Sequence, residues 1–337
     1  MTDATKYIVA LPVRALTWLG GQGTRAIGAL VFIGIAAPPL GVLLKPFVTE
    51  AVFLLLCTSF LRVDLRALRD YLRRPGLVLA ATAWTTAAVP LITGGSCFLT
   101  GVEQRSPDLY LALMLQAVAS PMMASPALAA VMGLDSTLVL VTLVSSTAVV
   151  PITASLFAYI FFGSALTISP FGLGLKLIVI LAGAMLAASV LRWWAGALAI
   201  QRHACAIDGL TVLFLFVFVA AVMGNVVGGF LANPMVTLAL TFVAFAVFFV
   251  LLGATMLVFR KAGYGPAMSL GLMVSQRNMG LMLAATDGVL PGTTWLYFAL
   301  SQFPIYLSPQ LLGPIVRRGL SAHQPASPAP DPRVHEV

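Results

Sequence analysis

Charged residues are placed along this chain so that long stretches contain none. Asp, Glu, Lys and Arg are all absent from residues 26–44, 75–102, 109–134, 136–175, 209–259 and 288–316. A helix needs about 20 apolar residues to cross a hydrocarbon core of about 30 Å. Two of the stretches, 136–175 and 209–259, are long enough for two spans each, and both carry Gly, Ser, Asn or Pro near the middle. This pattern predicts an all-α integral membrane protein.

Ten transmembrane helices account for the pattern. Their expected ranges are 25–44, 46–63, 76–94, 109–132, 137–162, 171–192, 208–230, 235–259, 266–287 and 293–316. Around them we expect a cytoplasmic or interfacial N-terminal segment (1–24), a first five-helix half (25–162), a second five-helix half (171–316) and a disordered cytoplasmic tail (317–337). None of the remaining loops is long enough to hold a soluble domain.

Composition and charge support a membrane location. Residues of the set AVILMFWYC make up 60% of the chain and charged residues 9%, whereas a soluble protein carries roughly 25% charge. Of the 19 Lys and Arg residues, Lys45 and Arg105 fall in loops predicted to face outside, and Lys176 and Arg277 fall within spans. The other 15 lie on the opposite side, so we expect a multi-pass protein of the plasma membrane with both termini in the cytoplasm. Basic residues scattered over short loops favour contact with membrane lipid and argue against nucleic acid as a partner.

Two of the predicted spans are interrupted. Span four contains Pro121 and Pro126, which lack backbone donors, and span nine contains the polar run 275–278, which cannot all face lipid. Pro121 lies 12 residues into its span, about 18 Å, and Arg277 lies 11 residues into its own, about 17 Å. Both interruptions therefore reach the midplane, from opposite sides. Broken helices that cross near the midplane in corresponding halves predict two inverted five-helix repeats with a transporter binding site between them.

Candidate substrate or ion contacts follow from these positions. The strongest candidates are Arg277, Asn278 and Gln276, and the weaker ones are Ser275, Ser120, Ser125, Ser145, Ser146, Thr147 and Gln302. An arginine at the centre of a membrane helix costs about 2.5–3.5 kcal/mol on insertion. Three alternatives stay open: the prolines as simple kinks, Arg277 as a structural residue bound to carbonyls, and the hydroxyls of spans five and ten as contacts between helices.

The ten spans, the proline-broken fourth span and the run Arg277-Asn278-Met279-Gly280-Leu281 in the ninth resemble the bile acid:sodium symporter family over residues 25–316. The resemblance implies a panel domain of spans one, two, six and seven. It also implies a core of spans three to five and eight to ten, in which the unwound fourth and ninth helices cross at the sodium and substrate sites.

Three positions depart from the family pattern. Met273 stands where members with sodium sites carry a glutamate, Arg277 where they carry Gln, and Ser125-Pro126 where they carry a Ser-Asn pair. We hypothesise that Arg277 takes over the charge of bound sodium. It would do so either by holding the crossed helices through carbonyl and hydroxyl contacts or by pairing with an anionic substrate. Na⁺ remains a candidate coupling ion, and we expect no other cofactor and no confident metal site.

These observations predict a secondary transporter of a small organic anion, working by alternating access, with sodium coupling altered or absent and no obligate protein partner. The alternative is a membrane receptor or sensor that binds a ligand without moving it. An intramembrane enzyme is disfavoured, because Asp108, Asp208 and Asp287 lie at span ends and no histidine or cysteine cluster accompanies them.

Overall fold

The computed structural model describes residues 14–22, 29, 33, 34, 36–62, 75–162, 169–224 and 226–323. Over these residues the chain is helical, and its one isolated β-bridge joins Pro121 to Arg277. The first 13 residues of the expected N-terminal segment, much of the expected first span and the tail from 324 lie outside the described residues.

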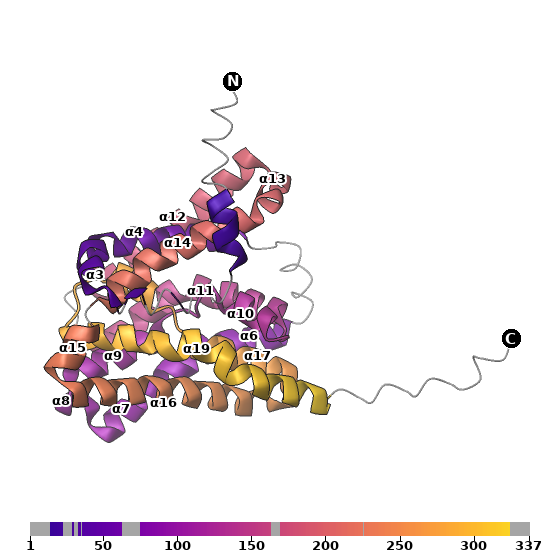
Figure 1. Ribbon diagram of the computed structural model, residues 1–337. Coiled ribbons are helices and arrows are strands. Elements are labelled where there is room, and N and C mark those ends of the chain that lie inside the picture. The colour runs from indigo at the N-terminus through magenta and orange to yellow at the C-terminus, as the bar shows by residue number, and fades with distance from the viewer. Residues whose placement is uncertain are drawn as a thin grey trace, which may run out of the picture.

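Figure 1 shows the order and arrangement of the helices along the chain. The first half contains α3 (Pro38–Leu44), a 3₁₀ turn (Lys45–Phe47), α4 (Val48–Leu61), α6 (Pro75–Ala83), the π-helix η2 (Trp84–Ala88), α7 (Val89–Thr100), α8 (Val102–Arg105), α9 (Pro107–Val118), α10 (Ser125–Val131), α11 (Ser136–Phe157) and the π-helix η3 (Ala158–Phe162). The second half contains α12 (Pro170–Ala195), α13 (Ala197–Arg202), α14 (Ala204–Met223), α15 (Val226–Ala232), α16 (Pro234–Val258), a 3₁₀ turn (Arg260–Ala262), α17 (Tyr264–Ser275), α18 (Met279–Ala285) and α19 (Gly292–His323).

Six helical segments of the described chain are long and apolar enough to cross a membrane. They are Pro38–Leu61, Pro75–Thr100, Ser136–Phe162, Pro170–Ala195, Ala204–Ala232 and Pro234–Val258. Pro107–Val118 is a shorter apolar helix. An all-α fold with six such segments agrees with the prediction of a membrane-embedded protein.

The chain reverses direction near the 3₁₀ turn Lys45–Phe47. Gly20 lies beside Gly209 near the start of α14, and Gly41 packs so closely on Gly224 past its end that a Cβ at position 41 would lie 2.5 Å from the Cα of Gly224. The chain then returns along α4, and Arg62 forms an ion pair with Asp208 at 3.1 Å. Such a reversal is what the predicted boundary between spans 25–44 and 46–63 requires.

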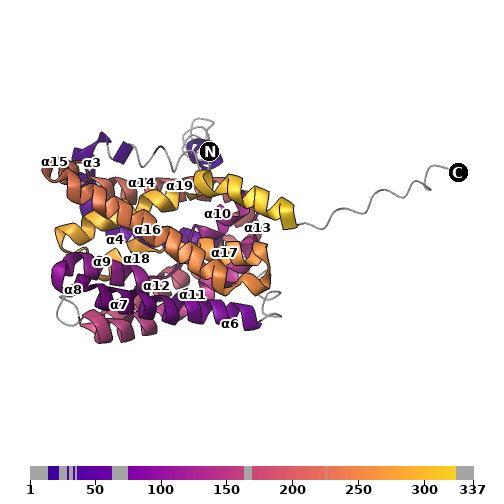
Figure 2. The same ribbon diagram turned by 90° about the horizontal axis from the view of Figure 1, so that it is seen from below.

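The helices form two groups. Helices α3, α4, α12 and α14 pack on one another and make a layer, which we call the four-helix layer (Figure 1). It covers a second group, the main body, made of α6, α7, α9, α10, α11, α16, α17, α18 and α19. Seen from below, α6 and α7 lie along one side of the main body and α19 along the other (Figure 2). The two groups meet where α12 packs on α11 and where α4 packs on α18.

The last helix is longer than expected. We predicted a disordered tail from residue 317, but α19 continues to His323, so the first seven residues of that tail are helical. The reason is packing: Val316 is fully buried, and Gly319 sits directly against the ring of Tyr264. Hydropathy misses this extension because one face of the helix is covered by protein while the other carries arginines.

Candidate binding site at two broken helices

The break between α9 and α10 follows from its prolines. Helix α9 ends at Val118, and Ala119 has an extended backbone with φ −62° and ψ 149°. Pro121 lacks an N–H and disfavours helical geometry in the residue before it, so the helix cannot continue through this point. Helix α10 restarts at Ser125, with Pro126 in its first turn, where a missing N–H costs nothing.

The break between α17 and α18 has a capping residue. Gln276 leaves helical geometry with φ −95° and ψ 93°, immediately after α17 ends. Asn278 then caps α18, because its Oδ1 accepts a hydrogen bond from the N–H of Leu281 at 3.1 Å. The side chain of Asn278 is therefore committed at least partly to its own helix.

The two breaks cross each other and satisfy each other's backbone. The N–H of Asn278 donates to the carbonyl of Ser120 at 2.8 Å, and the N–H of Met122 donates to the carbonyl of Gln276 at 2.7 Å. Together they form the antiparallel bridge between Pro121 and Arg277. The sequence-based expectation that the two interruptions meet is thus confirmed, and we call residues 119–124 and 276–278 the helix crossing.

Arg277 lies at the centre of the helix crossing and is 1% exposed. Its Nη1 donates to the carbonyls of Ala119 at 2.9 Å and Thr85 at 3.3 Å, and its Nη2 donates to Thr85 at 3.3 Å. Its Nε has no hydrogen-bond partner among the described residues. Arg277 therefore contacts carbonyls, as the first of its two expected roles requires, and still keeps donor capacity.

The carbonyl of Thr85 is available because of the π-helix η2. The N–H of Val89, which would reach Thr85 in an α-helix, donates instead to Trp84. The next residue is Pro90, which has no N–H to offer. The carbonyl of Thr85 therefore accepts no hydrogen bond from its own helix and is free to accept from Arg277. Sequence reasoning did not include span three in the site, and Pro90 was the signal that could have revealed it.

A group of buried polar atoms in the helix crossing, at the start of α10 and on α11 has no hydrogen-bond partner among the described residues. They are the hydroxyls of Ser120, Ser125, Thr142, Ser146 and Thr147, Oε1 of Gln276 and Nε of Arg277. Each such group left unpaired would cost about 1–3 kcal/mol. Most of these atoms are donors, so this region could satisfy the acceptors of an occupant.

The hydroxyls of α11 lie at the depth of the helix crossing. The N–H of Asp135, just before α11, donates to Oγ of Ser269 at 3.1 Å, which ties α11 to α17. From there Thr142 is about 10 Å along its helix and Ser275 about 9 Å along its own. At its other end α11 leads to Phe161, whose carbonyl accepts a hydrogen bond from Tyr110 at 2.7 Å. Helix α11 therefore extends through the depth at which the helix crossing lies.

Other predicted contacts are used locally. The hydroxyl of Ser275 donates to the carbonyl of Leu272 at 2.9 Å, and Nε2 of Gln302 donates to Phe298 in its own helix at 3.3 Å. Ser145 is only half-buried. None of these three hydrogen-bonds to the helix crossing within the described part of the chain.

Two buried amides fasten α19 to the rest of the site. Tyr297 donates its hydroxyl proton to Oε1 of Gln116 at 2.5 Å, which joins α19 to α9. Nε2 of Gln276 donates to Oγ of Ser308 at 3.0 Å, which joins α19 to the helix crossing. Tyr297 and Ser308 were not among the predicted residues, because nothing in an apolar span distinguishes them from ordinary contacts between helices.

No carboxylate offsets the guanidinium of Arg277 in the described residues. The ion pairs there are Arg62 with Asp208 and Lys176 with Asp287. Met273, at the position where the resemblance would place a glutamate, is fully buried. The described residues also contain no group of His, Cys, Asp and Glu side chains that could hold a metal ion. The site is thus a buried cation among hydroxyl donors, which suits an anion.

Comparison with protein-family models and with curated proteins found no match to this chain. The fold and the site define its class: an all-α, membrane-embedded protein in which two broken helices cross around a buried arginine.

Proposed function

We propose that this protein is a secondary transporter that carries a small organic anion across the plasma membrane by alternating access. It would have ten spans in two inverted repeats, both termini in the cytoplasm, and an architecture like that of the bile acid:sodium symporters. The observation that carries the proposal is Arg277, a fully buried guanidinium at the crossing of two broken helices, with no acidic partner among the described residues.

An anion at this position would complete the bonding of the site. A purely structural arginine is expected to use all of its donors, whereas Nε of Arg277 remains unpaired. Carboxylate or sulfate oxygens would accept from Nε and from the hydroxyl of Ser120 in the helix crossing. One fixed positive charge favours a monoanion, because a dianion would leave a net negative charge buried.

The same charge argues for sodium-independent transport. A guanidinium repels Na⁺ in a medium of low dielectric constant, and Met273 provides no carboxylate to counter this repulsion. Uniport or exchange of the anion therefore fits better than symport. Sodium symport through hydroxyls and carbonyls alone is the competing mechanism.

The two helix groups support alternating access. The helices of the four-helix layer pack mainly on one another, as do those of the main body. The helix crossing lies within the main body. Movement of one group past the other would expose the crossing to each side of the membrane in turn, as in other transporters built from repeats.

Uptake into proteoliposomes tests the proposal. The purified protein would be offered labelled monoanions, including a bile salt, a keto acid and a sulfate ester, with equal NaCl or choline chloride outside. We expect uptake of at least one anion in both salts, loss of that uptake in Arg277→Gln, and partial retention in Arg277→Lys. Uptake at the wild-type rate by the Arg277→Gln variant would overturn the proposal that Arg277 binds the transported anion. Saturable binding without uptake would favour a receptor.

Melting temperatures separate the coupling mechanisms without a known substrate. A ligand that binds only the folded protein raises its stability by mass action. We expect equal melting temperatures in NaCl and choline chloride at matched ionic strength. A rise specific to Na⁺ would refute the sodium-independent mechanism in favour of symport.

A further inference from the structure

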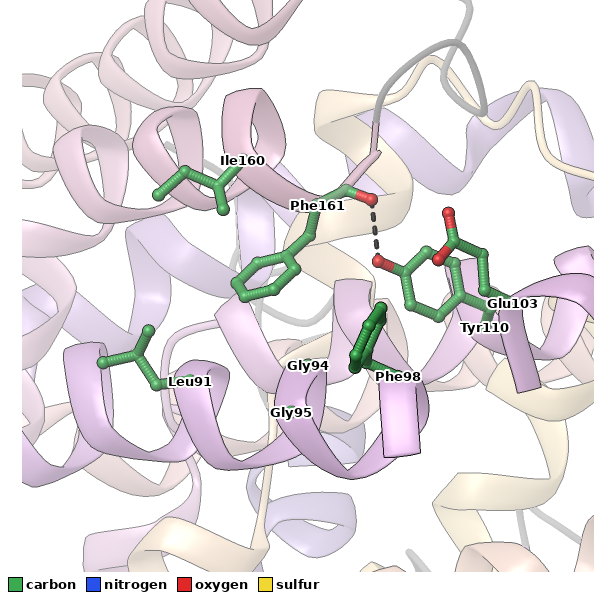
Figure 3. A pocket seen from close by; sticks show the side chains of 8 residues that line it. All are labelled: Leu91, Gly94, Gly95, Phe98, Glu103, Tyr110, Ile160 and Phe161. Atoms are coloured by element: carbon green, nitrogen blue, oxygen red, sulfur yellow. Dashed lines mark hydrogen bonds between the residues drawn. The ribbon is translucent and has the colours of Figure 1, made fainter. Parts of the chain in front are cut away.

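A second candidate site lies at the far end of α9, away from the helix crossing. Eight residues of α7, α8, α9 and η3 line an open hollow of about 430 Å³ (Figure 3). They are Leu91, Gly94, Gly95, Phe98, Glu103, Tyr110, Ile160 and Phe161. Tyr110 is nine residues before Ala119, about 13 Å along the helix, so this hollow is separate from the site of Arg277.

Two adjacent glycines create the hollow. A Cβ on Gly94 would lie 2.7 Å from the ring of Phe161, so only glycine lets that ring settle against α7. A Cβ on Gly95 would meet nothing within 4 Å, because this position faces open space. Phe161 is held in place by its carbonyl, which accepts the hydroxyl proton of Tyr110 at 2.7 Å (Figure 3). The shape is therefore fixed by the fold rather than left by a loose packing defect.

The walls of the hollow open onto the apolar outer surface of the helices. Phe98 is 72% exposed, and Leu91 and Ile160 are 53% exposed each. In a membrane-embedded protein such side chains meet acyl chains. A ligand enters this hollow sideways from the bilayer, and its body must be apolar.

One end of the hollow carries a carboxylate. Glu103 is exposed, belongs to the short helix α8 beyond the end of α7, and has no ion pair within the described residues. Figure 3 shows its carboxylate beside Tyr110, with the ring of Phe98 nearby. A carboxylate with aromatic rings around it recognises ammonium groups by charge, hydrogen bonds and cation–π contact. Its position at the end of the membrane helix α7 is where lipid headgroups lie.

We propose that this hollow binds a phospholipid with a primary-amine headgroup, such as phosphatidylethanolamine. The ammonium donates to the carboxylate of Glu103, and one acyl chain lies over Gly95 between Leu91 and Ile160. A primary ammonium has three N–H donors for the carboxylate, whereas the trimethylammonium of choline has none. The proposal does not depend on which substrate, if any, the helix crossing transports.

Native mass spectrometry of the full-length protein in detergent tests the proposal. Phosphatidylethanolamine, phosphatidylcholine and phosphatidylglycerol with matched chains would be titrated separately. We expect the ethanolamine lipid to be retained at least several-fold better than the other two. Equal retention of all three, or preference for the glycerol lipid, would overturn the proposal.

Variants locate the site. Glu103→Gln should abolish the preference for ethanolamine lipid, and Gly95→Leu should reduce retention of the lipid itself by filling the hollow. Gln104→Ala, on the same short helix, is the matched control and should behave as the wild type. Melting temperatures in lipid-free detergent establish that each variant is folded. Undiminished preference in Glu103→Gln together with undiminished retention in Gly95→Leu would place the lipid elsewhere and refute the assignment. Soluble phosphoethanolamine should not compete, because it lacks the chains that the walls require; full competition would contradict a lipid as occupant.

Discussion

Lys176 of α12 forms an ion pair with Asp287, the second residue after α18, and so joins the four-helix layer to the main body. Asp287 has a positive φ of 52° and is followed by Gly288 with φ 67°, so the chain turns sharply to present this carboxylate. Lys45 lies 4.6 Å from the ring centroid of Trp295 and makes a second such connection. The ion pairs and cation–π contacts that bridge the two groups in the described chain thus lie at the ends of α18 and α19 that the charge bias assigns to the outside.

The Lys176–Asp287 pair should influence transport more than stability. Its side chains are 37% and 60% exposed, and exposed pairs contribute about 0–1 kcal/mol. We expect Lys176→Met and Asp287→Asn to leave the melting temperature nearly unchanged but to alter the uptake rate several-fold, because the two groups separate more easily. The exchanged pair Lys176→Asp with Asp287→Lys is the control and should recover part of the wild-type rate. Wild-type uptake in both single variants would show that the pair is not part of the movement.

A carboxylate at position 273 should block the anion site. Met273 is fully buried in the last turn of α17, and its carbonyl accepts a hydrogen bond at 3.3 Å from the N–H of Gln276, the residue before Arg277. A glutamate at position 273 would therefore bring a buried negative charge next to the helix crossing. We expect Met273→Glu to lose the rise in melting temperature that a transported anion causes, while Met273→Gln, of the same length without charge, keeps most of it. An undiminished rise in Met273→Glu would contradict charge pairing between Arg277 and the anion.

Pro90 should act on Arg277 through the backbone. Pro90→Ala supplies an N–H that can take the carbonyl of Thr85 away from the guanidinium. A double-mutant cycle with Arg277→Gln should therefore show a coupling of about 0.5–3 kcal/mol in unfolding free energy. Pro314→Ala, an exposed proline inside α19, should show no coupling to Arg277→Gln. Additive effects of Pro90→Ala and Arg277→Gln would mean that the π-helix does not serve the arginine.

Close approach of α3 and α14 should make Gly41 intolerant of any side chain. A Cβ at this position would lie 2.5 Å from the Cα of Gly224 and 2.6 Å from the carbonyl oxygen of Ala220. We expect Gly41→Ala to lower the free energy of unfolding by about 1–3 kcal/mol, measured by denaturation in detergent. Gly76→Ala, where a Cβ meets nothing within 4 Å, should be neutral or slightly stabilising. Equal stabilities of the two variants would show that the close helix contact gives way without cost.

The breaks in spans four and nine could be read from the sequence because their causes are local. Pro121 and Pro126 remove donors wherever they occur, and the polar run 275–278 has no place in lipid. Their meeting could also be predicted, since helix rise converts residue counts into depth. These elements, with the placement of Arg277, are the part of the site that the sequence predicts.

The surroundings of Arg277 could not be predicted in the same way. Its contact with Thr85 depends on one π-helical turn, which shifts hydrogen bonds by one residue without changing the hydrophobic pattern. The side chain of Gln302 was expected near the site, yet it bonds to its own helix at Phe298. Such choices are decided by rotamers and tertiary packing, to which hydropathy and spacing are blind.

The helix crossing has a consequence for how the protein is made. Its two segments come from opposite halves of the chain, with Ala119 and Arg277 separated by 158 positions. Until the second half enters the bilayer, the carbonyl of Ser120 and the N–H of Met122 have no partner in the crossing, and unpaired backbone groups in hydrocarbon are costly. During synthesis the backbone groups of the first break therefore stay unpaired until the second break, which is synthesised much later, has been inserted. Neither half can form the helix crossing alone.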